Sequence, residues 1–257
     1  MARLPVLMYH AVPPSGSGDA LTVPLPLVVR QWKALRENGF RLLGLTEALA
    51  VKAEQAQARV VALTFDDGYA DFLAVPRLLA DHEARATLYL PTSHLGTDDR
   101  LIATAGRLLT WAEVADLPRD VVEIGGHAHL HRPLDVLRRG DQMHEVLTCR
   151  RLLAERAGVE AASFCYPNGY HDARVRRAVA GAGFGNACTV GRRVAETTGD
   201  PFGLPRLQVM PQHDEAGVLD LVEHGEPGWV PQVKRAAQPG WRVARRTVFR
   251  TTGRVLT

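Results

Sequence analysis

Cysteine is scarce in this 257-residue sequence, which contains only Cys149, Cys165 and Cys188. Their spacing matches neither a disulfide framework nor a zinc ribbon, and this excludes the small domains that depend on such staples. The odd count is typical of a protein in a reducing compartment. Cys165 has no evident base beside it and no helix N-terminus next to it, so the sequence does not favour a cysteine nucleophile.

Long apolar runs are also lacking. No segment approaches the roughly 18 uninterrupted apolar residues of a membrane-spanning helix, although 46% of the residues are hydrophobic. Residues 1–10 carry a short apolar run that Pro5 interrupts, and no small-residue cleavage site follows it. We therefore expect neither a secretion signal nor a transmembrane helix, and we expect a cytoplasmic protein.

Strand-like and helical patterns alternate along the chain. The strand-like stretches fall near residues 4–9, 40–45, 60–65, 85–91, 121–125, 163–166, 185–190 and 204–209. The clearest helical patterns cover residues 70–81, residues 141–157 and a segment that begins at Asp172. This alternation predicts a parallel α/β fold. The chain is long enough for one (β/α) barrel and too short for two.

The run Thr-Phe-Asp-Asp-Gly-Tyr at residues 64–69 indicates chemistry at the end of a strand. The apolar residues 60–63 are typical of a buried parallel strand, so Asp66 and Asp67 should lie where that strand ends. Adjacent carboxylates repel each other, and a bound cation would relieve the repulsion. Gly68 allows the turn that brings both carboxylates to one site. The plainer alternative is a solvated turn.

A histidine cluster follows the strand-like residues 121–123. His127 and His131 are four residues apart, so they would share a face on a helical turn, and His129 would point elsewhere. Imidazole together with carboxylate suits zinc and other first-row divalent ions. Alone, the cluster could be a surface loop. Because both polar groups follow strand-like stretches, together they favour one metal site.

In these motifs the chain resembles the polysaccharide deacetylases of carbohydrate esterase family 4. The resemblance extends to Tyr9-His10, to Phe-Cys-Tyr-Pro-Asn-Gly at residues 164–169 and to Leu-Pro-Arg-Leu at residues 204–207, in the familiar order. It implies a distorted (β/α) barrel of about seven strands, similar to a TIM barrel. Residues 1–212 would form this catalytic domain, and residues 213–257 a C-terminal extension.

The resemblance also implies roles for the first two motifs. Asp66 matches the catalytic base, and Asp67, His127 and His131 match three metal ligands. Amide hydrolysis needs such residues independently of the resemblance, because a divalent metal with three protein ligands and an open position lowers the pKa of bound water to about 7. A carboxylate that does not bind the metal can then take the proton of that water. We expect one divalent ion, with zinc the first candidate.

The third and fourth motifs supply further candidates. The resemblance points to the backbone N–H of Asn168 as a donor to the oxyanion. Tyr166, Pro167 and Arg206 are the expected substrate-binding residues. Cys165 stands where the family usually has an arginine that orients the base, and Arg206 is one residue that could take over this task.

The general acid is the second departure from the commonest family pattern. Many members use a histidine on a late strand, but residues 204–209 contain none. In a closed barrel an N-terminal strand can lie beside the strand that carries Asp66, which makes His10 the candidate acid. Two alternatives are that His10 only hydrogen-bonds the Asp66 region, and that His213 is the acid.

The basic charge of the chain is concentrated at its C-terminus. Residues 232–257 carry seven basic residues and no acidic one, and the other 24 basic and 28 acidic residues leave the rest at −4. The seven are Lys234, Arg235, Arg242, Arg245, Arg246, Arg250 and Arg254. This tail could lie on an anionic membrane, hold an acidic glycan, or pack its tryptophans on the barrel with the arginines in water, which we favour. Without a recognition motif, we expect no nucleic-acid partner.

The expected function is metal-dependent removal of N-acetyl groups from the amino sugars of a glycan, oligosaccharide or glycolipid. One alternative is a related amidohydrolase that cleaves a small non-sugar amide or imide. Another is a catalytically inactive carbohydrate-binding protein, although such a protein would not need Asp66 as a base. The sequence does not predict an oligomeric state.

Overall fold

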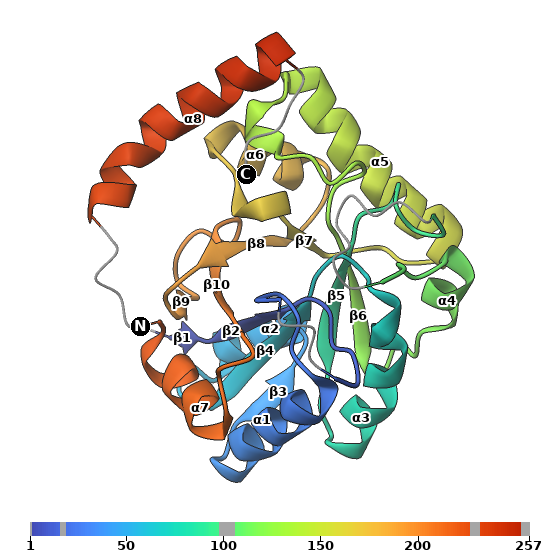
Figure 1. The fold of residues 1–257 in the computed structure, drawn as a ribbon, viewed down its shortest axis with the longest axis vertical. Coiled ribbons are helices and arrows are strands. Elements are labelled where there is room, and N and C mark those ends of the chain that lie inside the picture. Colours follow the sequence, from blue (N-terminus) through green and yellow to red (C-terminus); the bar gives the residue numbers. More distant parts are fainter. Residues whose placement is uncertain (1, 16–18, 98–105, 227–231, 253–257) are drawn as a thin grey trace.

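The computed structural model describes residues 2–15, 19–97, 106–226 and 232–252. Within these ranges the strands form a barrel and most of the helices lie around it (Figure 1). None of the described helices combines the length and the apolar character needed to cross a membrane.

Seven parallel strands close the barrel. They are β2 (Val6–Tyr9), β4 (Val60–Phe65), β5 (Ala86–Leu90), β6 (Val122–Gly126), β7 (Ser163–Cys165), β8 (Asn186–Gly191) and β10 (Leu204–Gln208). The order around the wall is β2, β10, β8, β7, β6, β5, β4, and β4 pairs back with β2. β3 (Arg41–Leu43) pairs with the first half of β4, on the side where β5 pairs with its last residues. The expected distorted barrel of about seven strands is confirmed.

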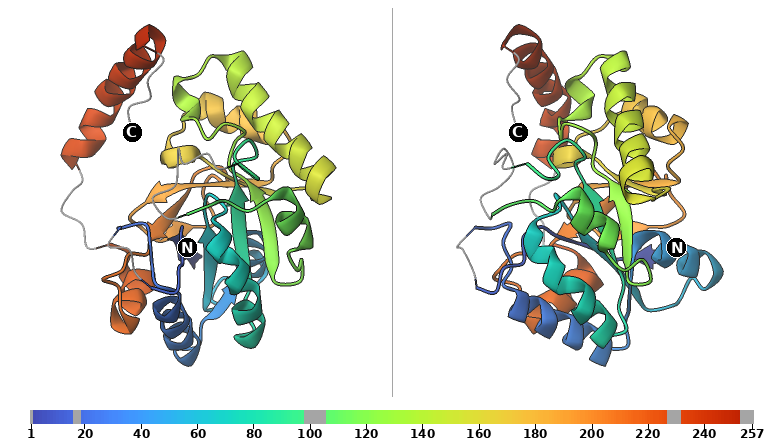
Figure 2. Two further views of the ribbon diagram at one scale, coloured as in Figure 1. Left: turned by 45° about the vertical axis from the view of Figure 1, so that its right-hand side comes forward. Right: turned by 90° about the vertical axis from the view of Figure 1, so that its right-hand side faces the viewer.

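Two short strands and eight helices accompany the barrel in the described part of the chain. Figures 1 and 2 show their arrangement. The strands β1 (Arg3–Leu4) and β9 (Ala195–Glu196) pair with each other. The helices are α1 (Leu25–Glu37), α2 (Leu45–Glu54), α3 (Val75–Asp81), α4 (Trp111–Asp116), α5 (Arg139–Ala157), α6 (Ala173–Gly181), α7 (Glu215–His224) and α8 (Gln232–Thr252). Three 3₁₀ turns are η1 (Ala70–Ala74), η2 (Leu134–Val136) and η3 (Pro167–Gly169). The pattern at residues 70–81 is therefore split between η1 and α3, and Pro76 lies in the first turn of α3, where it is tolerated.

Alternation along the strands decides which side chains enter the barrel. In β4, Val60 and Ala62 belong to the cluster inside the barrel, whereas Val61 and Leu63 pack under the helices. Because side chains alternate with a period of two, Asp66 continues the inner row just past the end of β4. Local strand geometry thus delivers a carboxylate to the mouth of the barrel.

The same alternation applies to β2 and β10. Val6 lies inside and Leu7 outside, so His10 falls on the inner row at the end of β2. Leu204 lies inside and Leu207 outside, which places Arg206 in the interior. One end of the barrel is closed by α2, whose Leu45 and Ala48 join the inner cluster. The open end is the one at which the parallel strands finish.

The C-terminal helix packs differently from the arrangement that we favoured. Trp241 is 43% exposed, whereas Arg245 is 1% exposed. The expectation of a packed tryptophan and solvated arginines is therefore wrong for these two residues. The physical reason is that the charge of Arg245 is paired inside the protein with Asp135, which is itself buried. Trp229 and Arg254 lie outside the described residues.

Candidate active site

The candidate residues meet at the open end of the barrel. Asp66 and Asp67 follow β4, His127 follows β6, and His10 follows β2. Together with His131 they line a pocket of about 490 Å³. Residues from three different strand ends therefore share one cavity at the C-terminal face, as expected for a barrel enzyme.

The chain makes a tight turn at the two adjacent aspartates. Asp67 has φ 71° and Gly68 has φ 73°, so the chain reverses directly after β4. The Gly68 N–H donates to the Asp66 carbonyl at 2.9 Å. The positive φ favours glycine at position 68, and a Cβ there would lie 2.5 Å from Leu90 Cδ2 and force that side chain to move.

The histidines converge by a different route from the one expected. Residues 127–133 form an irregular loop, because Ala128 has φ 62° and His131 has φ 51°, and the expectation of a helical turn is wrong. The loop nevertheless brings His131 Nε2 to 3.2 Å from His127 Nε2. His129 turns away, as expected, and its Nδ1 lies 3.0 Å from Thr92 Oγ1.

Asp67, His127 and His131 form a compact triangle of ligand atoms. Asp67 Oδ1 lies 3.5 Å from His127 Nε2 and 3.4 Å from His131 Nε2. Two atoms that bind a tetrahedral zinc at about 2.1 Å lie about 3.4 Å apart, so the triangle has the size of one face of such a site. Asp67 Oδ1 is buried and has no hydrogen-bond partner among the described residues. A divalent cation would satisfy it, so these three residues fit a metal.

The protonation behaviour of His131 and Asp67 agrees with this fit. Burial lowers the pKa of His131 to about 4, which keeps its imidazole neutral and available as a ligand at neutral pH. Burial alone would raise the pKa of Asp67, but the neighbouring His127 and His131 outweigh it and hold that pKa below its usual value. The carboxylate is therefore ionised. His127 Nδ1 lies 2.8 Å from the Cys165 carbonyl, which fixes the ring so that Nε2 faces Asp67.

Asp66 is held apart from the triangle by Arg206. Arg206 Nη1 donates to Asp66 Oδ1 and Nη2 to Oδ2, both at 2.6 Å. Burial pushes the pKa of Asp66 upward, but the charge and hydrogen bonds of Arg206 outweigh it and hold the pKa well below its usual range. Arg206 is fully buried and lines the pocket, and its contacts support the orienting task. Its role in substrate binding stays a prediction.

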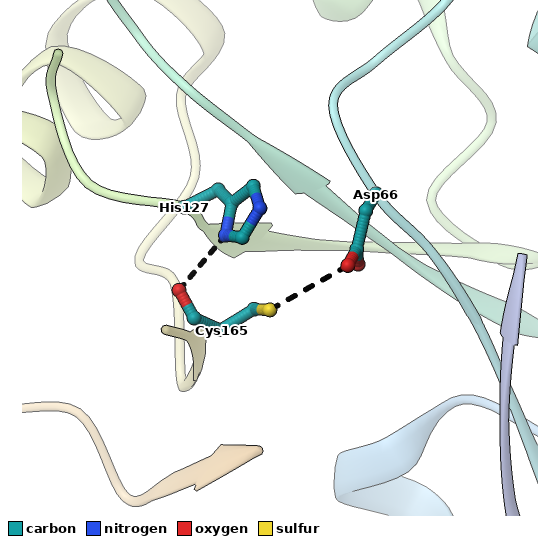
Figure 3. Close-up of side chains that lie close together, drawn as sticks. All are labelled: Asp66, His127 and Cys165. Atoms are coloured by element: carbon teal, nitrogen blue, oxygen red, sulfur yellow. Dashed lines mark hydrogen bonds between the residues drawn. The ribbon is translucent and has the colours of Figure 1, made fainter. Parts of the chain in front are cut away.

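Cys165 contacts both His127 of the triangle and Asp66 (Figure 3). Its carbonyl accepts from His127, and its thiol lies 3.7 Å from Asp66 Oδ2. Asp66, His127 and Cys165 are close enough to form a second metal-ligand set. They suit a metal less well, because Arg206 already neutralises Asp66 and burial raises the pKa of the Cys165 thiol far above its ordinary value. The same burial argues against Cys165 as a nucleophile, in line with the sequence.

His10 and His213 occupy different environments. β2 pairs directly with β4, and His10 Nε2 lies 3.8 Å from Asp66 Oδ2 at the pocket wall. His213 does not line this pocket, and its Nδ1 accepts a hydrogen bond from the Met210 N–H. The strand adjacency inferred from the sequence is confirmed. The role of His10 as an acid stays a prediction.

Of the motif at residues 164–169, Asn168 is the residue best placed to act in the pocket. Asn168 is exposed, has φ 56° and lines the pocket. Tyr166 borders the pocket, but its side chain is buried and its hydroxyl donates to the Phe202 carbonyl. Pro167 is buried and does not line the pocket. Substrate binding by the Tyr166 and Pro167 side chains is therefore not supported by their contacts.

Unusual backbone conformations gather at this site. Among the described non-glycine residues, five have positive φ, namely Asp67, Glu83, Ala128, His131 and Asn168. Four of the five belong to the turns and loops that form the pocket. Such conformations cost about 1–3 kcal/mol each and persist where the surrounding structure enforces them, which is typical of functional sites.

Part of the pocket wall was not anticipated from the sequence. His94 is buried and lines the pocket, and Leu21, Leu130 and Val190 form an exposed apolar rim. These residues lie on connecting loops or at the exposed end of β8. No motif marks them, because their position depends on how the loops fold over the barrel.

Comparison with known proteins gives the family. Residues 53–187 match the family model described as polysaccharide deacetylase. The match covers more than half of the chain and contains Asp66, Asp67, His127 and His131, and the chain belongs to this family. His10 and Arg206 lie outside the matched range. No curated protein sequence matches the chain significantly.

Solved structures share the fold. The deacetylase PplD of Streptococcus pyogenes, in complex with acetate, is 21% identical with a TM-score of 0.74 over 88% of this chain and 99% of that one. IcaB from Ammonifex degensii is 19% identical with a TM-score of 0.73, covering 87% and 98%. BC0361, a polysaccharide deacetylase from Bacillus cereus, is 19% identical with a TM-score of 0.73, covering 86% and 69%. At such identities the likeness establishes the barrel and leaves the substrate open.

Proposed function

We propose that this protein is a metal-dependent deacetylase that removes N-acetyl groups from the amino sugars of a glycan, oligosaccharide or glycolipid. The observation that carries the proposal is the division of labour between two adjacent carboxylates. Asp67 belongs to a triangle with His127 and His131 that fits zinc, while Asp66 is withheld from it by Arg206. A site that only bound a metal or a sugar would have no use for the separate carboxylate.

Each residue then has a distinct task. Asp67, His127 and His131 would hold the ion, which when bound lowers the pKa of a water molecule to about 7. Asp66 stays ionised beside Arg206 and accepts the proton of the attacking water. The Asn168 N–H donates to the developing oxyanion.

The leaving amine must be protonated before it departs. His10 is placed for this step, since it is only 14% exposed, lines the pocket and lies on the side of Asp66 where β2 runs. General-acid catalysis of this kind typically contributes about 10²–10⁴-fold to the rate.

The basic helix supports a second element of the proposal, namely peripheral contact of a cytoplasmic protein with an anionic membrane. Arg245 and Arg246 pair with Asp135 and Asp172, but the other five basic residues of the tail have no acidic neighbour within residues 232–257, and Trp241 and Val243 are exposed on α8. Exposed aromatic and aliphatic groups beside cations are typical of interfacial helices. Sedimentation with vesicles of phosphatidylserine and phosphatidylcholine tests it, and equal binding to vesicles of phosphatidylcholine alone would argue against an electrostatic contact.

Acetate release tests the proposal directly. Zinc-loaded protein is incubated with N-acetylhexosamine oligomers, and acetate and new free amines are measured together, with Asp66→Asn as the inactive control. We expect equal amounts of the two products. Turnover of small non-sugar amides or imides in place of the oligomers would favour the rival amidohydrolase. Oligomer binding without any hydrolysis would favour a carbohydrate-binding protein.

A further inference from the structure

The helix α8 reaches two loops of the site through Arg245. The Arg245 side chain is buried and donates from Nη2 to Asp135 Oδ1. Its guanidinium also lies over the Tyr170 ring, with Cζ 3.3 Å from the centroid. One side chain thus contacts the segment that follows the loop of residues 127–133 and the segment that follows η3.

The neighbouring Arg246 makes the same connection a second time. Its Nε donates to the Asp135 carbonyl at 2.8 Å, and its Nη2 donates to Asp172 Oδ2 at 2.7 Å. Asp172 caps α6, because its other carboxylate oxygen accepts from the N–H groups of Arg174 and Val175. Arg246 therefore ties η2 to the start of α6.

Each of the two connected segments follows a residue of the candidate site. Asp135 lies four residues after His131, and Tyr170 lies two residues after Asn168. His131 and Asn168 both have positive φ, so neither loop would hold its conformation without contacts from elsewhere. The hydrogen bonds of Arg245 and Arg246 thus go to these two segments.

We propose that α8 is a clamp on the active site, and that Arg245 and Arg246 are positioning residues which set the distance between the His131 loop and the Asn168 loop. The proposal rests on the proposed function, since the loops matter as holders of a metal ligand and of an oxyanion donor. Guanidinium suits the task, because its fixed fork can bond two groups in defined directions while its flat face covers an aromatic ring.

The test uses the full-length protein and Arg246→Gln. Arg246 is partly exposed, so its replacement should leave the fold intact, whereas Arg245→Met would remove one side of a buried ion pair with Asp135. Arg245→Lys serves as the second variant, because it keeps the charge near Asp135 but cannot reproduce the fork. Arg59→Gln is the matched control, since Arg59 forms an exposed pair with Glu223 and directly precedes β4, at the end of the barrel opposite the active site.

Three quantities are measured for each variant. Zinc affinity is obtained by competition with a chelator, kcat and KM by acetate release, and local opening by hydrogen exchange of residues 129–137 and 168–172 in the metal-free protein. In Arg246→Gln we expect zinc affinity to fall about tenfold, the lower end of what loss of a partner behind a metal ligand brings. We expect kcat to fall more than KM rises, and both segments to exchange faster. Arg245→Lys should lie between Arg246→Gln and the wild type.

Three possible results decide whether α8 acts as a clamp on the active site. Unchanged zinc affinity, kcat and exchange in a folded Arg246→Gln protein overturn the clamp. A lower melting temperature with unchanged affinity and kcat also overturns it, because α8 would then only add stability. If the wild type neither binds zinc nor releases acetate, the proposed function fails, and the exchange of the two segments alone decides whether α8 holds them.

Discussion

Arg206 donates a hydrogen bond to each carboxylate oxygen of Asp66, with each N–O distance 2.6 Å. The pair spans the inside of the barrel from β10 to the end of β4, and the Arg206 guanidinium also donates to Thr64 Oγ1 and Cys165 Sγ. Paired, planar contacts fix both the charge and the direction of the carboxylate. The residue proposed as the base is thus held ionised by a cation that never reaches the solvent.

Replacement of this cation should change the pH dependence of the enzyme. In Arg206→Met, the strongest opposition to burial is removed, so the pKa of Asp66 should rise from its depressed value. Because the base must be ionised, the acid limb of the kcat/KM profile should move to higher pH. Removal of one partner of a buried pair should also lower the free energy of unfolding by about 3–5 kcal/mol. A folded variant with an unmoved acid limb would show that Arg206 does not control Asp66.

The two adjacent aspartates should fail in different ways. Asp66→Asn should bind zinc like the wild type and lose at least about a hundredfold in kcat, since general-base catalysis typically contributes 10²–10⁴-fold. Asp67→Asn should weaken zinc binding itself, because Asp67 Oδ1 completes the triangle with the two histidines. Isothermal titration with zinc and acetate release separate the two effects. Equal metal loss in both variants would make Asp66 a ligand and place the base elsewhere.

His10 should act on the leaving group. In His10→Ala, zinc and substrate binding should persist while kcat falls, and the basic limb of the pH profile should move or vanish, because an acid must carry its proton to act. The defect should shrink for an activated ester whose leaving group needs no proton. Near-normal amide hydrolysis by His10→Ala would leave the protonation step to His213 or to water.

Asp71 should make stability depend on pH in an unusual direction. Its Oδ2 accepts from the Val12 N–H at 2.7 Å, yet burial raises its pKa to about 6. The folded protein therefore holds the proton more tightly than the unfolded chain, whose Asp pKa is about 3.9. The stabilisation from this group is complete below about pH 4 and is lost as the pH rises to about 6.

Asp71→Asn removes this dependence and keeps an oxygen that can accept from Val12. At pH 8 the free energy of unfolding should rise by about 1–2 kcal/mol, a value reduced for the partial exposure of the side chain. Urea denaturation between pH 4 and pH 8 measures it, with the exposed Asp81→Asn as control. If the difference between variant and wild type were independent of pH, the raised pKa would not be the cause.

The sequence predicted the strands and the convergence of their ends for a physical reason. Apolar runs such as residues 60–65 have few ways to be buried, and parallel strands finish at one face of the barrel. Asp66 and His127 follow such runs, so their meeting did not depend on details of the loops. β2 beside β4 followed from closure of the barrel, which needs a neighbour on each side of β4.

Features that depend on loop conformation or long-range pairing were missed or only partly predicted from the sequence. His127 and His131 approach through an irregular loop with two positive φ values, and no helical spacing encodes it. The pairing of Arg206 with Asp66 was foreseen from the sequence only as one possibility, because it joins residues 140 positions apart that only the closed barrel brings together. Arg245 is buried because it pairs with Asp135 and lies over the Tyr170 ring. The charge pattern of the tail alone does not identify these two partners.

The central claim is that Asp67, His127 and His131 bind one divalent metal while Asp66 stays outside its coordination shell. A crystal structure of zinc-loaded protein, with the ion identified by anomalous scattering at the zinc edge, tests it most directly. We predict all three ligand atoms at about 2.0–2.2 Å from the ion, and Asp66 still bonded to Arg206. An ion bound by Asp66 and Cys165 instead, or any of the three ligands more than about 4 Å from it, well beyond coordination distance, would contradict the account.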